Sequence, residues 1–202
     1  MIYDFADRAI KDMNRRNLRA FDKLKLLNFD EMNILHTVTS TYKNSVKLAK
    51  SHYKAIFLNA FLDAIEEVGR KNADLEDSVL NDWLLDMLED YDALTHYRFN
   101  EETERKTART AEALIATKVD SREVERALRL WTLQVGAYAD RSVLDGRLEA
   151  FREAGIKKVM WITQDDNKVC VNCDALDKKI FPIDQVPPRQ HYGCRCYLKP
   201  VN

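Results

Sequence analysis

The residues best suited to chemistry are four cysteines and one histidine near the C-terminus of this 202-residue chain. They form the pattern Cys170-x2-Cys173, followed after a longer gap by His191-x2-Cys194-x-Cys196. Two residues between paired ligands let both side chains of a tight turn reach one tetrahedral ion, and thiolate and imidazole are ligands that Zn²⁺ prefers. The spacing therefore predicts one structural zinc ion per chain.

Five candidate ligands compete for four positions around such an ion. We expect the shell to consist of Cys170, Cys173, His191 and Cys194. An all-cysteine shell in which Cys196 replaces His191 stays open, because alternate residues of a strand point to the same side. Free cysteines or disulfides without metal are a further alternative, which an oxidising environment would favour.

The same pattern argues against an enzyme. A shell closed by four protein ligands leaves no open position for a metal-bound water, and a redox-active Cys-x-x-Cys would need a βαβ context that is not predicted here. The other histidines (His36, His52 and His96) stand singly, and the pair Asp165-Asp166 is predicted to form a turn. The sequence contains no phosphate-binding glycine loop and no nucleophile motif, so we expect no enzymatic activity.

The elements that must position this segment begin with a body in which apolar residues recur every three or four positions, as in amphipathic helices. Asp30 and Asp120 are predicted N-caps, and Gly69 is a predicted C-cap. Gly136 and Gly146 should weaken, kink or break the last helix. We expect helices over residues 3–27, 31–68, 78–90, 101–118 and 121–153.

After Ile156 the pattern changes to short β-type runs, at residues 159–163, 178–181 and 197–201. The predicted fold class is α+β and mainly α. An elongated helical body with a long amphipathic helix occupies residues 1–155, and a small β-rich, zinc-ribbon-like module occupies residues 156–202. A tail this short buries little core of its own, so we expect metal binding to supply most of its folding energy.

The composition indicates an ordered protein without a membrane partner, with 46% hydrophobic and 32% charged residues and a net charge of −1. Its apolar runs are far shorter than the roughly 20 residues of a membrane-spanning helix, and the N-terminus lacks an apolar signal segment. Acidic residues concentrate at 73–105. We interpret this segment as a solvated surface, with a docking face for a basic partner as the alternative.

The tail resembles the C-terminal signature of the phage minor head proteins, the phage Mu F-like and SPP1-type head-morphogenesis family. The resemblance rests on the run 159–163 with its tryptophan, the Cys-x-x-Cys knuckle, the loop Pro187-Pro188 and the final His-x-x-Cys-Arg-Cys segment. A looser similarity extends upstream to the charged segment 101–116. About half of the chain is covered, and the similarity is specific only at the tail.

This resemblance implies a role in head morphogenesis. The implied partners are the phage portal protein, the scaffold or major capsid protein, and non-specific double-stranded DNA during packaging or ejection. The implied location is the phage head interior of the virion, and the host cytoplasm during assembly. Some relatives carry toxin or ADP-ribosyltransferase domains after this module; because the chain ends at Asn202, we expect none here.

Basic residues around the module are candidate contacts to DNA phosphates, because such contacts need positive charge but no base recognition. They are Lys157, Lys158, Lys168, Lys178, Lys179, Arg189, Arg195 and Lys199. The alternative is that they only keep a small module in solution. A zinc-ribbon nucleic-acid-binding regulatory protein is the alternative function.

Overall fold

Helices dominate the computed structural model of the chain, which describes residues 3–24, 30–70, 75–92, 94–164, 169–191 and 193–201. Its helices are α1 (Asp4–Leu24), α2 (Glu31–Glu67), α3 (Asp77–Glu89), α4 (Phe99–Ala116), α5 (Ser121–Glu153) and the short α6 (Val171–Asp174). Its strands are β1 (Lys158–Ile162), β2 (Ile180–Pro182) and β3 (Tyr197–Val201), with a 3-10 turn at Ile183–Gln185. The predicted class, α+β and mainly α, is confirmed.

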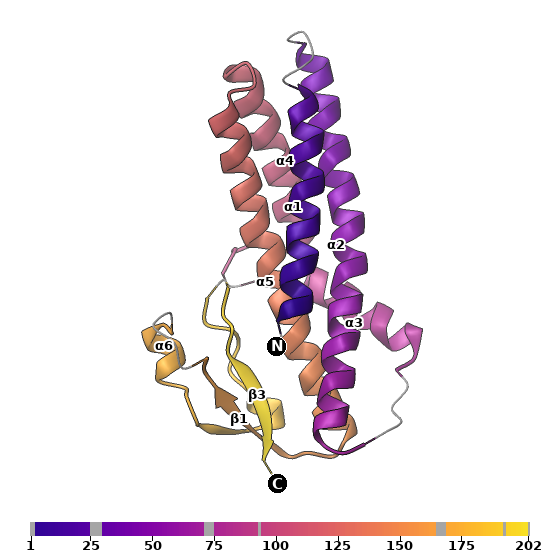
Figure 1. Cartoon of the computed structure of the whole chain (residues 1–202), viewed down its shortest axis with the longest axis vertical. Helices are drawn as coiled ribbons and strands as arrows, with labels where there is room; N and C mark the ends of the chain where they lie inside the picture. The colour runs from indigo at the N-terminus through magenta and orange to yellow at the C-terminus, as the bar shows by residue number, and fades with distance from the viewer. Residues whose placement is uncertain are drawn as a thin grey trace.

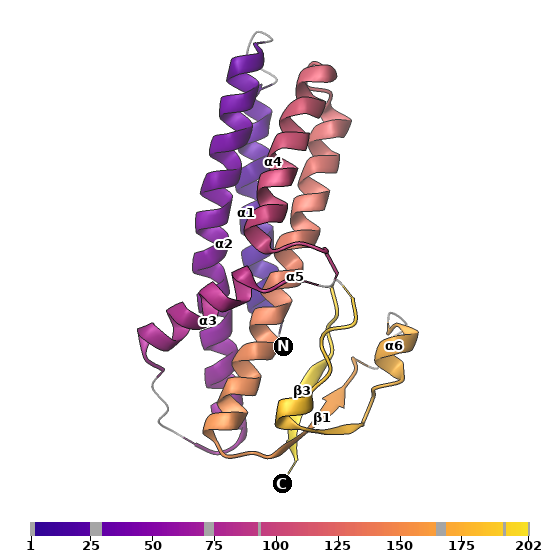
Figure 2. The same cartoon turned by 180° about the vertical axis from the view of Figure 1, so that it is seen from behind.

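Helices α1, α2, α4 and α5 run side by side along the long axis, while α3 lies across them and the β-containing tail sits beside one end of α5 (Figures 1 and 2). At about 1.5 Å per residue, the 37 residues of α2 span roughly 55 Å. None of the described helices is both long enough and apolar enough to cross a membrane.

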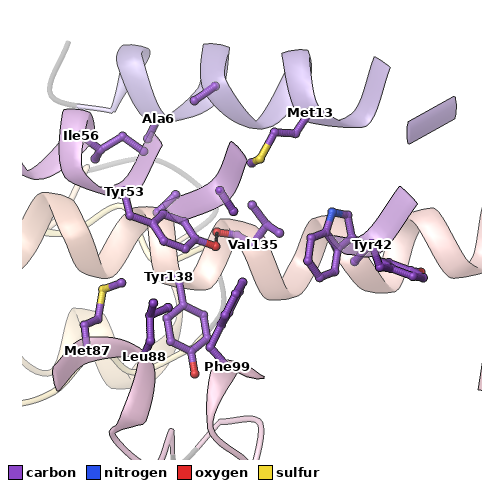
Figure 3. Close-up of a cluster of buried hydrophobic side chains, with 14 of the residues drawn as sticks. Ala6, Met13, Tyr42, Tyr53, Ile56, Met87, Leu88, Phe99, Val135 and Tyr138 are labelled. Atoms are coloured by element: carbon purple, nitrogen blue, oxygen red, sulfur yellow. Dashed lines mark hydrogen bonds between the residues drawn. The ribbon is translucent and has the colours of Figure 1, made fainter. Parts of the chain in front are cut away.

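Aromatic side chains fill the middle of the bundle (Figure 3). The ring of Phe99 packs edge-on against Tyr138, at 4.9 Å between centroids, and against Tyr53 at 5.7 Å. Trp131 contacts the ring of Tyr42 at 5.1 Å. These five side chains are fully buried and come from α2, α4 and α5, so they join the helices into one core.

The helix ends follow the capping residues of the sequence. The carboxylate of Asp30 accepts a hydrogen bond from the backbone N–H of Met32, and Asp120 caps α5 through Arg122 in the same way. Gly69 takes the left-handed conformation (φ +75°) that commonly ends a helix. The predicted end of the first helix at Leu27 lies outside the described residues.

Helix α5 continues through both of its glycines, so of the expected effects (weakening, a kink or a break) the break does not occur. At Gly146 a Cβ atom would lie 2.4 Å from the carbonyl oxygen of Phe57 and 3.2 Å from the Cβ of Ala60. Gly146 therefore allows α5 to approach the backbone of α2 closely. At Gly136 an added Cβ would lie 3.7 Å from its nearest neighbour, a side-chain atom of Ile10. Gly136 therefore does not allow a comparably close approach of two helices.

The tail forms an antiparallel sheet in the order β2-β1-β3. Along β1 the side chains of Val159 and Trp161 are buried, whereas Lys158 on the opposite face is exposed. The buried face joins a core cluster with Phe57 of α2 and Phe151 of α5. Burial against the helices is therefore a source of stability for the tail besides any metal, which the sequence did not reveal.

Candidate metal centre

The short helix α6 and the turn before β3 bring the five predicted ligands together. Cys170 stands at the N-cap of α6, where its Sγ accepts a hydrogen bond from the backbone N–H of Cys173 at 3.4 Å. On the other side, the backbone N–H of Cys194 donates to the carbonyl oxygen of His191 at 3.3 Å, which closes a turn. Gly193 takes φ +66° in this turn, a conformation that glycine adopts without strain.

Two distances within the cluster match those between ligands of one tetrahedral ion. The Sγ atom of Cys173 lies 3.6 Å from the Sγ of Cys194 and 3.5 Å from the Nε2 of His191. Around one tetrahedral zinc ion, two thiolate sulfurs would be about 3.8 Å apart, and a sulfur and an imidazole nitrogen about 3.6 Å apart. A disulfide would require about 2.05 Å between sulfurs, and all four cysteines are free.

Two overlapping groups of ligand atoms, each lying within 4.8 Å of one another, share Cys173. One contains Cys170, Cys173 and His191, and the other contains Cys173, Cys194 and Cys196. Cys173, Cys194 and Cys196 are buried, whereas Cys170 and His191 are partly exposed beside a cavity of about 90 Å³. The predicted ligands are thus brought together, with Cys173 at their centre, and the cluster could hold a metal ion.

Hydrogen bonding is the main influence on the pKa of Cys194, and burial is the main influence on that of Cys173. A hydrogen bond from the Cys196 thiol lowers the pKa of Cys194, and the nearby guanidinium of Arg189 adds to this effect. Burial raises the pKa of Cys173. A cation would offset this cost because it stabilises thiolates, so the donor set fits a soft or borderline metal ion.

Arg189 lies between the candidate metal ligands and α5. It is nearly buried and already paired, which corrects its assignment as a phosphate contact. Its side chain is only 10% exposed and forms an ion pair with Asp140 of α5 at 2.8 Å. It also donates hydrogen bonds to the carbonyl oxygens of Ala137, at 2.5 Å, and of Cys194, at 3.3 Å. Arg189 therefore connects the ligand turn to α5.

The other candidate phosphate contacts that the structure describes are exposed. Lys158 and Lys199 lie on the outer face of the sheet. Lys158 alternates with the buried Val159 along β1, and Lys199 is the register partner of Met160, which lies on the same face as Lys158. Lys157, Lys178, Lys179 and Arg195 are exposed in the connections. Lys168 and the predicted turn at Asp165-Asp166 lie outside the described residues.

Three residues that the sequence did not single out attach the tail to the bundle. The hydroxyl of Tyr3 donates to the carbonyl oxygen of Cys196 at 2.5 Å. Arg147 and Asp140 both project from the buried face of α5 and bond to the tail. For Arg147 and Asp140 the sequence did contain a signal, because both are charged residues at helix positions where the pattern predicts apolar ones. Buried charges require partners, so such positions indicate contacts to another segment.

The remaining histidines stand apart from the cluster. His36 and His96 are exposed, and His96 forms a hydrogen bond through Nδ1 with the hydroxyl of Tyr91 at 3.2 Å. His52 lies partly buried on α2, and burial lowers its pKa. Neither metal group of the described residues includes any of the three.

Comparisons with known proteins identify no relative. No family model matches the chain. No curated protein and no solved structure matches it significantly.

Proposed function

We propose that this chain is a phage minor head protein, a structural component of head assembly whose tail is held by one structural zinc ion. The observation that carries the proposal is the convergence of three cysteines and one histidine on Cys173, in a tail that packs against a helical bundle. A metal in that position would link α6 to the turn before β3.

A structural role suits this donor set better than a catalytic one. The proposed shell of Cys170, Cys173, His191 and Cys194 combines ligands of both groups through Cys173, with Cys196 as the alternative to His191. Thiolate-rich shells of this kind are typical of structural zinc, whereas catalytic zinc keeps one position for water or substrate.

The phage assignment rests on the resemblance of the tail, and the shape of the molecule supports it. A rod of long helices with a knob at one end offers extended surfaces to other proteins (Figure 1). The proposed partners are the portal protein and the scaffold or major capsid protein. The exposed lysines of the tail, without Arg189, would contribute a weaker and salt-dependent contact to packaged DNA.

Two measurements on purified protein test this proposal. Elemental analysis should find one zinc per chain in the wild type and none in Cys173→Ser, which removes the ligand common to both groups. Co-expression with the portal protein of the same phage should then give a complex that survives size-exclusion chromatography. A zinc-free wild type would overturn the metal assignment, and a portal that never associates would overturn the assembly role.

The exposed lysines on the outer face of the sheet favour one other function, a zinc-ribbon regulator that binds nucleic acid. This alternative predicts tight duplex binding whose affinity falls steeply with salt, together with loss of affinity in Lys158→Ala/Lys199→Ala. Zinc with duplex binding but without portal binding would favour it over the head-assembly role.

A further inference from the structure

A groove of about 450 Å³ lies between α5, the connection from α3 to α4, and the proline loop that precedes the metal ligands. The described residues Asp90, Tyr91, Asp92 and Leu94 form one wall. This volume is within the range of about 300–1,000 Å³ that binding pockets usually have. The groove lies outside the metal centre, and the proposed function assigns it no role.

Apolar side chains form part of the groove lining. They are Leu144 and Leu148 of α5 and Val186, Pro187 and Pro188 of the loop. Tyr91 is 60% exposed, so a large apolar surface stands free at the rim. An occupant would therefore need apolar groups of its own.

Carboxylates outnumber cations along the groove. Arg141 is shared between two carboxylates, Asp90 at 2.5 Å and Asp145 at 3.3 Å. Arg189 is already paired with Asp140, outside the lining. Because each cation has at least one acidic partner, the carboxylate of Asp92 adds a net negative charge to the wall.

The acidic character extends beyond the groove along the adjoining end of α3. Asp86 and Glu89 are exposed in the last turns of this helix, which contains no basic residue there. The guanidinium of Arg98 donates to the carbonyl oxygen of Glu89 at 2.5 Å, so one cation of the chain already offsets the negative end of the helix dipole.

The groove wall also holds a hydrogen-bond donor that lacks an acceptor. Arg189 is 10% exposed, and its Nε–H is buried without a partner in the part of the chain that the structure describes. This atom is closed off from the surface, so a ligand in the groove does not reach it. Neither metal group found among the described residues includes an acid of this groove.

From the apolar lining and the acidic charge together, we infer that the groove binds a basic segment of a partner protein. Apolar side chains of the segment would cover Leu144, Leu148 and Val186. Its lysine or arginine side chains would pair with Asp92 and share Asp90 with Arg141. The inference does not depend on the metal or on the phage assignment.

A binding experiment with matched variants tests this. The probe is a short fluorescein-labelled peptide of alternating lysine and leucine, measured by fluorescence anisotropy against the full chain. In Asp90→Asn/Asp92→Asn the amide oxygens can still accept the bonds of Arg141 and of the turn at Leu94, so the fold should persist. We expect this variant to bind the probe about tenfold more weakly, since exposed charge pairs each contribute modestly.

Glu112→Gln/Glu125→Gln is the matched control, because it removes two exposed charges elsewhere on the bundle and should leave the affinity unchanged. Tyr91→Ala should weaken binding about threefold, by removing the apolar rim. An all-lysine probe that binds as tightly as the lysine–leucine probe would overturn the inference, and so would an equal loss in the control. A dimer of this chain that only the groove variant abolishes would assign the groove to a second copy and also overturn it.

Discussion

The guanidinium of Arg147 donates two hydrogen bonds to the carbonyl oxygen of Leu198, at 3.2 Å from Nε and 2.9 Å from Nη2. Arg147 lies on α5 and Leu198 on β3, and both side chains are fully buried. The same guanidinium pairs with Glu67 near the end of α2. One charged side chain thus joins two long helices to the last strand of the tail.

Replacing this side chain should destabilise the whole fold. Arg147→Met fills similar space but leaves the carbonyl of Leu198 without its donors and Glu67 without its partner. We expect the free energy of unfolding to fall by about 3 kcal/mol, as for other broken buried ion pairs. Chemical denaturation followed by circular dichroism measures this loss. Arg152→Met, on the exposed side of the same helix, should cost less than about 0.5 kcal/mol; equal losses would refute the role of Arg147.

The two glycines of α5 should respond to alanine in opposite directions. Gly146→Ala places a methyl group against the backbone of Phe57, so we expect a loss of about 2 kcal/mol despite the better helix propensity of alanine. Gly136→Ala meets only Ile10, at 3.7 Å, and should stabilise by about 0.5–1 kcal/mol. Thermal melting of both variants checks the sign. Stabilisation by Gly146→Ala would contradict the close approach of α2 and α5.

Single substitutions should identify the fourth metal ligand. If His191 completes the shell, Cys196→Ser keeps one zinc per chain, whereas His191→Gln lowers zinc affinity at least about tenfold. Cobalt substitution provides the measurement, because its visible absorption distinguishes three thiolates with one imidazole from four thiolates. The reverse ranking of the two variants would assign the all-cysteine shell.

Removal of the metal should loosen the tail more than the bundle. The core of the bundle around Tyr53 and Trp131 does not include the ligands, whereas three of the four cysteines belong to the core of the tail. After chelation we expect faster hydrogen exchange at the amides of β1 and β3, with α2 still protected. Cys173→Ser should exchange like the chelated wild type. Uniform acceleration along the chain would show instead that the metal stabilises the whole protein.

Asp140 should make stability depend on pH. Burial raises its pKa to about 6, even though the guanidinium of Arg189 opposes this shift. Between about pH 4 and pH 6 the folded state then holds a proton that the unfolded chain has released, so stability present at low pH is lost as the pH rises through this window. Asp140→Asn lacks this loss. Its free energy of unfolding relative to wild type should therefore increase by about 2 kcal/mol across the window.

Asp177→Asn provides a comparison of opposite sign. The backbone N–H of Thr163 donates to the Asp177 carboxylate and lowers its pKa, so the stability that Asp177 contributes is lost as the pH falls through its folded-state pKa. Urea denaturation at several pH values gives both differences. Protonation of the metal ligands affects wild type and variants alike and cancels in the difference. Parallel curves for Asp140→Asn and wild type would contradict the burial argument.

Much of this architecture was predictable from local sequence signals. The capping residues Asp30 and Asp120 and the three- or four-residue apolar spacing located the long helices, because capping and amphipathicity are properties of neighbouring residues. The spacing of Cys170 with Cys173, and of His191 with Cys194, predicted the ligand cluster, because each pair shares one turn.

Only the tertiary structure decided how these parts meet. Gly146 is a close contact and not a helix break, because its effect depends on where α2 lies. Arg189 is a buried tether and not a phosphate contact, because Asp140, distant in sequence, neutralises it. The sequence by itself determined the helices, the short strands and the candidate ligands, because local propensity and ligand spacing depend only on residues that are close in the sequence. The packing of the tail on α2 and α5, and the groove beside α5, arise from contacts between distant segments, which no local pattern encodes.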